Sequence, residues 1–198
     1  VREYARLLKA AHTAIHAADP GATIVLAALA DYAWNHLARL NHFKIGRYYD
    51  VVAINLFTAR PKFVMRGVRI VRRVMRRGGA ARKPIWLTES TWPAGKGRVT
   101  RPGTAWQRAW YTTDAGMAKR VRSIYTVARK NRRRFKIGRV FWYTWASAYR
   151  EDDLFDYAGL VRFSGGEYEP RPALAAYVAS ARRNQGCTKS ADGLCEAR

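Results

Sequence analysis

The chain has 198 residues, of which 48% are hydrophobic and 13% aromatic, enough to bury the core of one globular domain. Its formal net charge is +23, so its surface attracts polyanions such as nucleic acid, acidic polysaccharide or an anionic membrane surface. The sequence holds no apolar run of about 18 residues, the length that a membrane-spanning helix needs.

Near-continuous apolar runs alternate with amphipathic segments along the whole chain. The first helix is predicted to stop at Asp19-Pro20-Gly21, because proline and glycine end helices and form turns. In the first half of the chain, the predicted elements are a helix at 2–18, a strand at 23–29, a short helix or helical loop at 33–43, a strand at 49–57, a helix at 61–77 and a strand at 84–89. A long loop to about 103 follows, and then a helix at 113–134, a strand at 137–145, an apolar segment at 159–163 and a helix at 172–183.

This alternation predicts an α/β fold of parallel strands covered by helices, built from right-handed βαβ units. Only four long strands are predicted, whereas a closed (β/α)8 barrel usually needs about 250 residues. We therefore expect residues 1–183 to form half of such a barrel and residues 184–198 to form a polar tail. Half a barrel leaves two sheet edges open, so we expect self-association or a missing half that covers them.

Glu89 ends the predicted strand at 84–89, where an apolar run leads directly into a carboxylate. In α/β folds, catalytic side chains gather at the carboxyl edge of a parallel sheet. A strand-end glutamate without further context is more often structural or solvated than catalytic. Glu89 is therefore a candidate whose role depends on the residues around it.

The polar tail holds the two cysteines, Cys187 and Cys195. A disulfide closing so short a loop would stabilise the fold by about 2.5 kcal/mol in the chain-entropy model, and it favours an oxidising, secreted setting. Two unpaired surface thiols are the alternative. The chain begins at Val1, inside a predicted helix and without methionine, so we interpret it as a truncated or processed product.

Several segments together carry a resemblance to a known family. They are residues 4–8 with 18–20, YDVVAIN at 49–55, KPIWLTESTWP at 83–93, RVFWYTW at 139–145, and YAGL at 157–160 with PRPA at 170–173. In order and spacing they resemble the C-terminal half of retaining glycoside hydrolases of the large (β/α)8 clan, which includes β-xylosidase-like, cellulase-like and exopolysaccharide-cleaving enzymes. The resemblance covers the chain to about Arg183.

The resemblance implies an enzyme that hydrolyses O-glycosidic bonds in an oligo- or polysaccharide, with Glu89 as the nucleophile. A mechanism that retains the configuration at the anomeric carbon requires a second carboxyl group about 5 Å from the nucleophile, which acts first as acid and then as base. In the family this residue ends the fourth strand, so we expect the chain to lack it and to hydrolyse poorly alone. Asp31, Asp152 and Asp153 are possible substitutes, with solvated loop acids as the alternative reading of all three.

The same resemblance implies three substrate-binding residues. Trp145, at the end of the last strand, matches a position beneath the sugar next to the scissile bond, and Trp92 lines the same cleft. Asn55 contacts a sugar hydroxyl or caps the following loop, while Phe57 stands where the family often has a tyrosine that hydrogen-bonds the nucleophile. The tryptophans expected to pack in the core or on helices are Trp34, Trp86, Trp106, Trp110 and Trp142.

Two other functions compete with hydrolysis. The first is a noncatalytic carbohydrate-binding remnant of the same fold. The second is nucleic-acid binding through arginine-rich helices, although no nucleic-acid-binding motif accompanies them and we do not expect it. These basic residues are Arg66, Arg69, Arg72, Arg73, Arg76 and Arg77, with Arg129, Lys130, Arg132, Arg133 and Arg134. The charge instead hints at an acidic glycan or cell-wall polymer.

No cofactor or metal is expected. Phosphate-binding loops and dinucleotide fingerprints are absent from the sequence. His12 and His16 lie four residues apart on one predicted helix face, a spacing that can hold a metal, but no third ligand follows. We interpret them as part of a solvated helix face.

Overall fold

The computed structural model describes residues 1–30, 32–100, 103–150, 155–184, 188–189 and 195–196. Its residues form two compact units. The sheet unit comprises Val1–Phe57, Phe63–Ser90 and Asn131–Phe141, and the hairpin unit comprises Thr58–Lys62, Thr91–Lys130 and Trp142–Arg198. None of the described helices is long and apolar enough to span a membrane.

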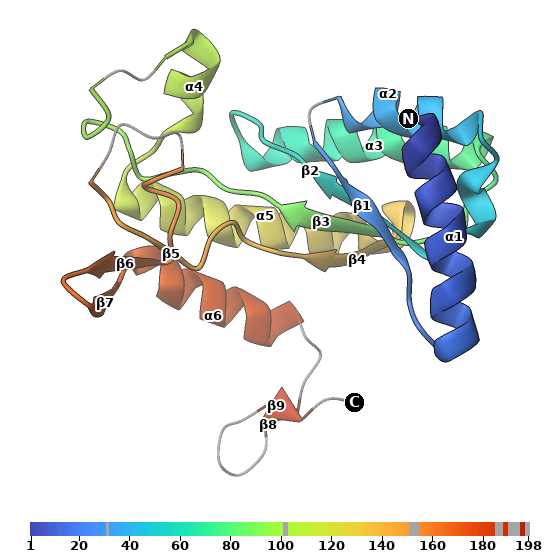
Figure 1. Ribbon diagram of the computed structural model, residues 1–198. Helices are drawn as coiled ribbons and strands as arrows, with labels where there is room; N and C mark the ends of the chain where they lie inside the picture. Colours follow the sequence, from blue (N-terminus) through green and yellow to red (C-terminus); the bar gives the residue numbers. More distant parts are fainter. Residues whose placement is uncertain (31, 101–102, 151–154, 185–187, 190–194, 197–198) are drawn as a thin grey trace. The chain divides into compact units, whose positions relative to one another are not determined.

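The sheet unit is built on four parallel strands that are neighbours in the order of the sequence, β1-β2-β3-β4. The helices α2 and α3 run along the same side of this sheet, above it in Figure 1. The elements are α1 (Arg2–Ala18), β1 (Val25–Leu29), α2 (Ala33–Asn41), the 3-10 helix η1 (Ile45–Arg47), β2 (Val51–Asn55), α3 (Pro61–Arg77), β3 (Ile85–Glu89) and β4 (Ile137–Val140). The predicted α/β class and parallel pairing are thus confirmed.

Local chemistry explains where these elements begin and end. Asp19 is extended at the end of α1, as expected before a proline, and its Oδ1 accepts a 2.9 Å hydrogen bond from the Gly21 amide. Proline at the first position of α3 is favourable, because its missing N–H has no helical partner there. Gly79, with φ of +78°, follows the end of α3 in the left-handed conformation that glycine adopts without strain.

The core of the sheet unit lies where its strands meet its helices. All five residues of β2 are buried, as expected for a strand with a neighbour on each side. The aliphatic side chains with no exposed surface are Leu26, Ala33, Leu37, Ile45, Val52, Ile54, Val64, Val68, Val71, Ile85 and Leu87. This packing holds the strand ends, and the polar residues on them, in fixed positions.

The hairpin unit contains a short helix and a β-hairpin that the sequence analysis did not predict. Its elements are α4 (Ala105–Trp110), most of α5 (Asp114–Phe135), β5 (Ala146–Ser147), β6 (Val161–Ser164), β7 (Glu167–Pro170), α6 (Pro172–Asn184) and the short pair β8 (Thr188–Lys189) and β9 (Cys195–Glu196). Gly165 and Gly166 have φ of +62° and +86° and join β6 to β7 in a two-residue turn.

The predicted strand at 137–145 was too long, because β4 ends at Val140. The backbone changes its hydrogen-bonding partner within this segment. The Phe141 amide still donates to Leu87, but the carbonyl oxygens of Thr144 and Trp145 accept from the amides of Leu160 and Val161. The predicted long strand is therefore replaced by the short strand β4, by a connection and, directly after Trp145, by a two-residue strand in a different sheet.

Candidate active site at the carboxyl edge of the sheet

Glu89 is the last residue of β3, at the carboxyl edge of the parallel sheet, as predicted. Asn55, the last residue of β2, is its partner in the strand register. The Leu56 amide donates a 3.2 Å hydrogen bond to the Glu89 carbonyl oxygen, so the pairing continues beyond the end of β2. The sheet thus brings Asn55 and Glu89 together, although they are far apart in the sequence.

Thr88 fixes the orientation of the Asn55 amide. Its hydroxyl group donates a 2.8 Å hydrogen bond to Asn55 Oδ1 and lies 3.3 Å from the Ile54 carbonyl oxygen. Asn55 is buried, with 9% of its surface exposed, so an unpaired amide there would carry a desolvation cost. This role of Thr88 was not predicted from the sequence, although a hydroxyl residue beside a strand-end carboxylate is visible there.

The carboxylate of Glu89 is half-buried and has no hydrogen bond or ion pair with any residue that the structure describes. Other carboxylates are engaged: Asp50 accepts from the Ile24 amide at 2.8 Å, and Asp114 is paired with Arg98 at 2.6 Å. A carboxylate held at a strand end without a protein partner is available for chemistry with a ligand.

Trp92 is fully buried, so its ring offers no surface to a sugar. Its indole N–H donates a 2.5 Å hydrogen bond to the Thr58 carbonyl oxygen. The ring packs against Trp142 with 6.1 Å between centroids, and the Trp142 N–H donates to the Ala158 carbonyl oxygen at 3.0 Å. Both side chains therefore hold loops of the hairpin unit together, which is the packing role expected of Trp142 and not the sugar contact expected of Trp92.

Trp145 is 58% exposed, which leaves its ring free to serve as the sugar platform that the sequence resemblance implies. It does not end a long strand, since it directly precedes the two-residue strand β5. Its backbone is anchored by the 3.0 Å hydrogen bond from the Val161 amide. The exposed ring is thus carried on a fixed backbone.

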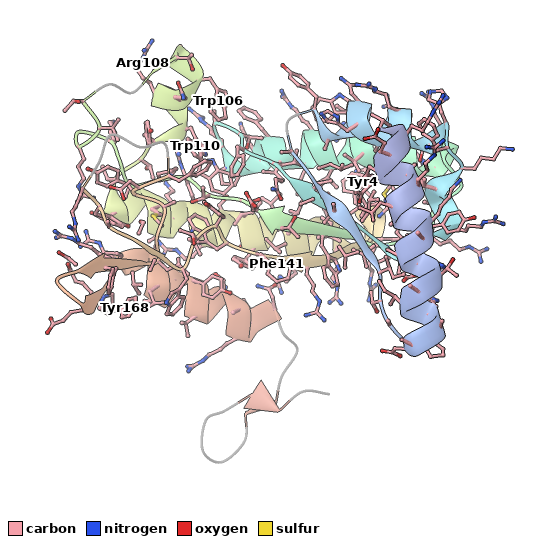
Figure 2. All side chains as sticks on the ribbon, in the orientation of Figure 1. Tyr4, Trp106, Arg108, Trp110, Phe141 and Tyr168 are labelled. Carbon is pink, nitrogen blue, oxygen red and sulfur yellow. The ribbon has the colours of Figure 1, made fainter. Side chains whose placement is uncertain are left out.

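The helix α4 presents a second aromatic surface, and Figure 2 shows Trp106 and Trp110 on it. Their rings stack with centroids 5.4 Å apart and an interplanar angle of 19°. Trp110 is fully buried and donates to the Thr91 carbonyl oxygen at 2.6 Å, whereas Trp106 is 43% exposed. The packing prediction is therefore confirmed for Trp110, while Trp106 covers it from the solvent side.

Several predicted residues lie outside the described part of the chain. They are Asp31, Asp152, Asp153 and Cys187. Cys195 lies in the short strand β9.

The two helix histidines interact with each other. The rings of His12 and His16 stack at 4.4 Å, and His12 meets the edge of Tyr48 at 5.3 Å. Across the described residues, no group of three or more histidine, cysteine, aspartate or glutamate side chains is arranged to hold a metal.

Arg72 is not part of a basic surface, contrary to the grouping made from the sequence. It is buried, with 6% exposure, and its guanidinium donates to the carbonyl oxygens of Lys83 at 2.8 Å and Phe135 at 2.5 Å. Burial lowers the pKa of Arg72, and the nearby charge of Arg76 lowers it further. Helical periodicity places one arginine of the series toward the core, where it ties the α3–β3 connection to the end of α5.

No protein-family model and no curated protein matches the chain. Among solved structures, its fold is similar to that of a GH128 (subgroup I) endo-beta-1,3-glucanase from Amycolatopsis mediterranei. A glutamate-to-alanine mutant of that enzyme, in complex with laminaritriose and laminaribiose, aligns with a TM-score of 0.56 and 18% identity over 87% of this chain and 65% of the glucanase. A glutamate-to-glutamine mutant in complex with laminarihexaose aligns with a TM-score of 0.55 and 17% identity, over 87% of this chain and 64% of the glucanase.

The chain therefore spans less than two thirds of the length of these glucanases. At such low identity the similarity concerns the fold alone. The chain has a glycoside hydrolase-like α/β fold.

Proposed function

We propose that this chain carries the nucleophile half of a retaining glycosidase active site, with Glu89 as the nucleophile. The observation that carries the proposal is the position of Glu89, which ends β3 beside Asn55 with a carboxylate that has no partner among the described residues. In the proposed reaction, Glu89 attacks the anomeric carbon, the bond to the leaving oxygen breaks, and water later hydrolyses the glycosyl ester.

The four parallel strands support an assignment to the C-terminal half of a (β/α)8 barrel. Their spatial order follows the sequence without reversal, as in a barrel, whereas a doubly wound sheet reverses its strand order at a switch point. In this assignment β1 to β4 are the fifth to eighth strands. The acid/base carboxyl group is then supplied by a segment outside these 198 residues.

A β-1,3-linked glucan is the proposed substrate. The structural neighbours are endo-beta-1,3-glucanases that bind laminari-oligosaccharides, and this supports the choice of sugar. The exposed ring of Trp145 is the proposed platform for a sugar face, and the Asn55 amide is the proposed partner of a sugar hydroxyl. The cysteines in the tail favour a secreted protein.

An activated substrate tests the nucleophile without the missing acid. The leaving group of 2,4-dinitrophenyl β-laminaribioside departs without protonation, so Glu89 alone should form the glycosyl ester. Intact-mass measurement is expected to show one added laminaribiosyl group, located at Glu89 by peptide mapping. Glu89→Gln should abolish the adduct, and the matched control Glu167→Gln, at an exposed position of β7, should leave it unchanged.

Two results would overturn the assignment. An adduct that persists in Glu89→Gln would place the nucleophile elsewhere. Binding of laminarihexaose by the chain, without any adduct from the activated substrate, would instead identify a noncatalytic carbohydrate-binding domain.

A further inference from the structure

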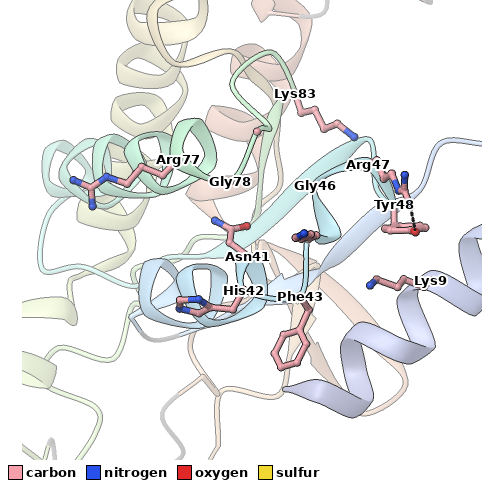
Figure 3. A pocket seen from close by; sticks show the side chains of 12 residues that line it. Lys9, Asn41, His42, Phe43, Gly46, Arg47, Tyr48, Arg77, Gly78 and Lys83 are labelled. Atoms are coloured by element: carbon pink, nitrogen blue, oxygen red, sulfur yellow. Dashed lines mark hydrogen bonds between the residues drawn. The ribbon is translucent and has the colours of Figure 1, made fainter.

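An open pocket of about 1070 Å³ lies at the amino edge of the sheet, which is the opposite edge from Glu89. It is formed by α1, by the connection that leads into β2 and by the connection that leads into β3 (Figure 3). Because the strands are parallel, their amino ends share this edge, and their carboxyl ends share the edge of Glu89. The pocket is therefore independent of the candidate active site.

The side chains that line this pocket carry positive charge and no negative charge. No aspartate or glutamate is among the lining residues, and its lysines and arginines are Lys9, Lys44, Arg47, Arg77 and Lys83. Lys83 has a structural role, because its ammonium group donates to the Tyr49 carbonyl oxygen and burial lowers its pKa. None of the other four forms an ion pair with a residue that the structure describes.

Two of these cations are held close together around one aromatic ring. Lys9 Nζ lies 5.4 Å from the centre of the Tyr48 ring, and the Arg47 guanidinium lies 4.9 Å from it. Arg47 also donates a 2.8 Å hydrogen bond to the Tyr48 hydroxyl group, drawn as the dashed line in Figure 3. Asp50 acts on Lys83, but no acidic residue lines the pocket, and an anionic ligand would neutralise the positive potential of the other cations.

A second pocket, of about 430 Å³, continues the same edge of the sheet. Pro84 lines this pocket and the preceding residue, Lys83, lines the first, so both pockets lie where the chain enters β3. Its charged lining residues are Arg132, Arg133 and Lys136, and it too has no acidic lining residue. The two pockets together form what we call the basic edge.

We propose that the basic edge binds a linear acidic polysaccharide through carboxylate groups spaced along the polymer. Arginine forks pair with carboxylates in a bidentate geometry, and lysines add point charges that tolerate a flexible partner. Two pockets in succession suit a polymer better than a single anion. The choice of a polysaccharide rests on the proposed function, whereas the choice of an anion rests on the charges alone.

A nucleic acid is the less favoured polyanion. Proteins that hold single strands combine a positive groove with aromatic rings on which bases stack. In the first pocket the Tyr48 ring is already covered by Lys9 and Arg47. His42 and Phe43 also line this pocket, so the case against nucleic acid is that no nucleic-acid-binding motif accompanies these cations, and the oligothymidylate arm of the test below decides it.

The test compares two triple variants of the full chain that lose the same charge. The pocket variant is Lys44→Gln, Arg47→Gln and Arg77→Gln, and the control is Arg6→Gln, Arg69→Gln and Arg73→Gln, with all six positions exposed. Binding of a fluorescein-labelled oligogalacturonate is followed by fluorescence anisotropy at several salt concentrations. Circular dichroism melting confirms that both variants are folded.

The pocket variant is expected to bind the probe about tenfold more weakly and with a shallower salt dependence, while the control changes by less than about threefold. Equal weakening in both variants would overturn the proposal, because it would show a diffuse attraction. An oligothymidylate of equal charge that binds more tightly through the same three residues would also overturn it, in favour of a nucleic acid. The Glu89 adduct is measured separately, so failure of either proposal is recognised without the other.

Discussion

The hydroxyl group of Thr88 donates a 2.8 Å hydrogen bond to Oδ1 of Asn55 on the neighbouring strand. Because the carbonyl side of the amide is occupied, Nδ2 of Asn55 is the group left to donate to a ligand. The register places this amide beside Glu89. A sugar hydroxyl at this edge would therefore meet a donor from β2 and a carboxylate from β3.

Thr88→Val should weaken both the fold and the site. Valine has a similar shape but no hydroxyl, so the buried Asn55 amide loses its partner and the free energy of unfolding should fall by about 1–2 kcal/mol. Urea denaturation measures this loss, and the rate of adduct formation at Glu89 should fall with it. Thr88→Ser keeps the hydroxyl and should restore most of the rate; a serine variant as slow as the valine variant would count against the positioning role.

Arg72→Met should destabilise the sheet unit by about 3 kcal/mol. The substitution removes the hydrogen bonds to the carbonyl oxygens of Lys83 and Phe135 and leaves these acceptors without a partner. The exposed neighbour supplies the control, because Arg73→Met changes the same charge at the surface and should alter stability by less than about 0.5 kcal/mol. Equal midpoints in urea for the two variants would contradict the structural role of Arg72.

Asp114 should make the stability of the hairpin unit depend on pH in the acid range. Partial burial pushes the pKa of its carboxyl group up, but the hydrogen bonds and charges of Arg98 and Arg171 outweigh burial and hold the pKa below the ordinary 3.8. The stabilisation is therefore fully present above the unfolded pKa and is lost as the pH falls through the lower folded value.

Melting temperatures of the wild type and of Asp114→Asn, measured from about pH 7 to about pH 2, test this expectation. The wild type should be the more stable protein at neutral pH, and the gap should close at the acid end of the range. A difference in melting temperature that stays constant with pH would mean that the charge of Asp114 does not contribute to stability.

Trp145 and Trp92 should respond differently to replacement by alanine. Trp92→Ala removes a fully buried ring and should cost about 3–5 kcal/mol of stability. Trp145→Ala removes a ring that is 58% exposed, so stability should change little while the dissociation constant for laminarihexaose rises. Calorimetric titration with this sugar checks the second effect, and unchanged affinity would exclude Trp145 as a platform.

Much of the sheet unit was predictable, because a parallel strand buried on both faces leaves a continuous apolar run in the sequence. The hairpin unit was less predictable, although two of its sequence patterns are typical of the structures they form. Gly165 and Gly166 are typical of a two-residue hairpin turn, and Thr104 with Gln107 forms the capping box that starts α4. The strand predicted at 137–145 was too long, because the pattern of apolar residues does not show where the backbone changes its hydrogen-bonding partner.

The candidate site was predictable in part. The carboxylate at the end of a strand is visible in the sequence, since an apolar run stops at Glu89. Its pairing with Asn55 and the hydrogen bond from Thr88 depend on strand register, which the sequence does not specify to one residue. The burial of Trp92 was also hidden, because a tryptophan after a strand suits a core as well as a cleft.

The two edges of the sheet are separated by the length of its strands. A strand of five residues such as β3 is about 17 Å long, whereas charges in solution are screened over about 8 Å at physiological ionic strength. Under those conditions the field of the basic edge has largely decayed before it reaches Glu89. In about 0.01 M salt the screening length grows to about 30 Å, so the field of the basic edge then extends to the carboxyl edge as well. Ionic strength alone thus sets whether the two edges act separately or as one electrostatic system.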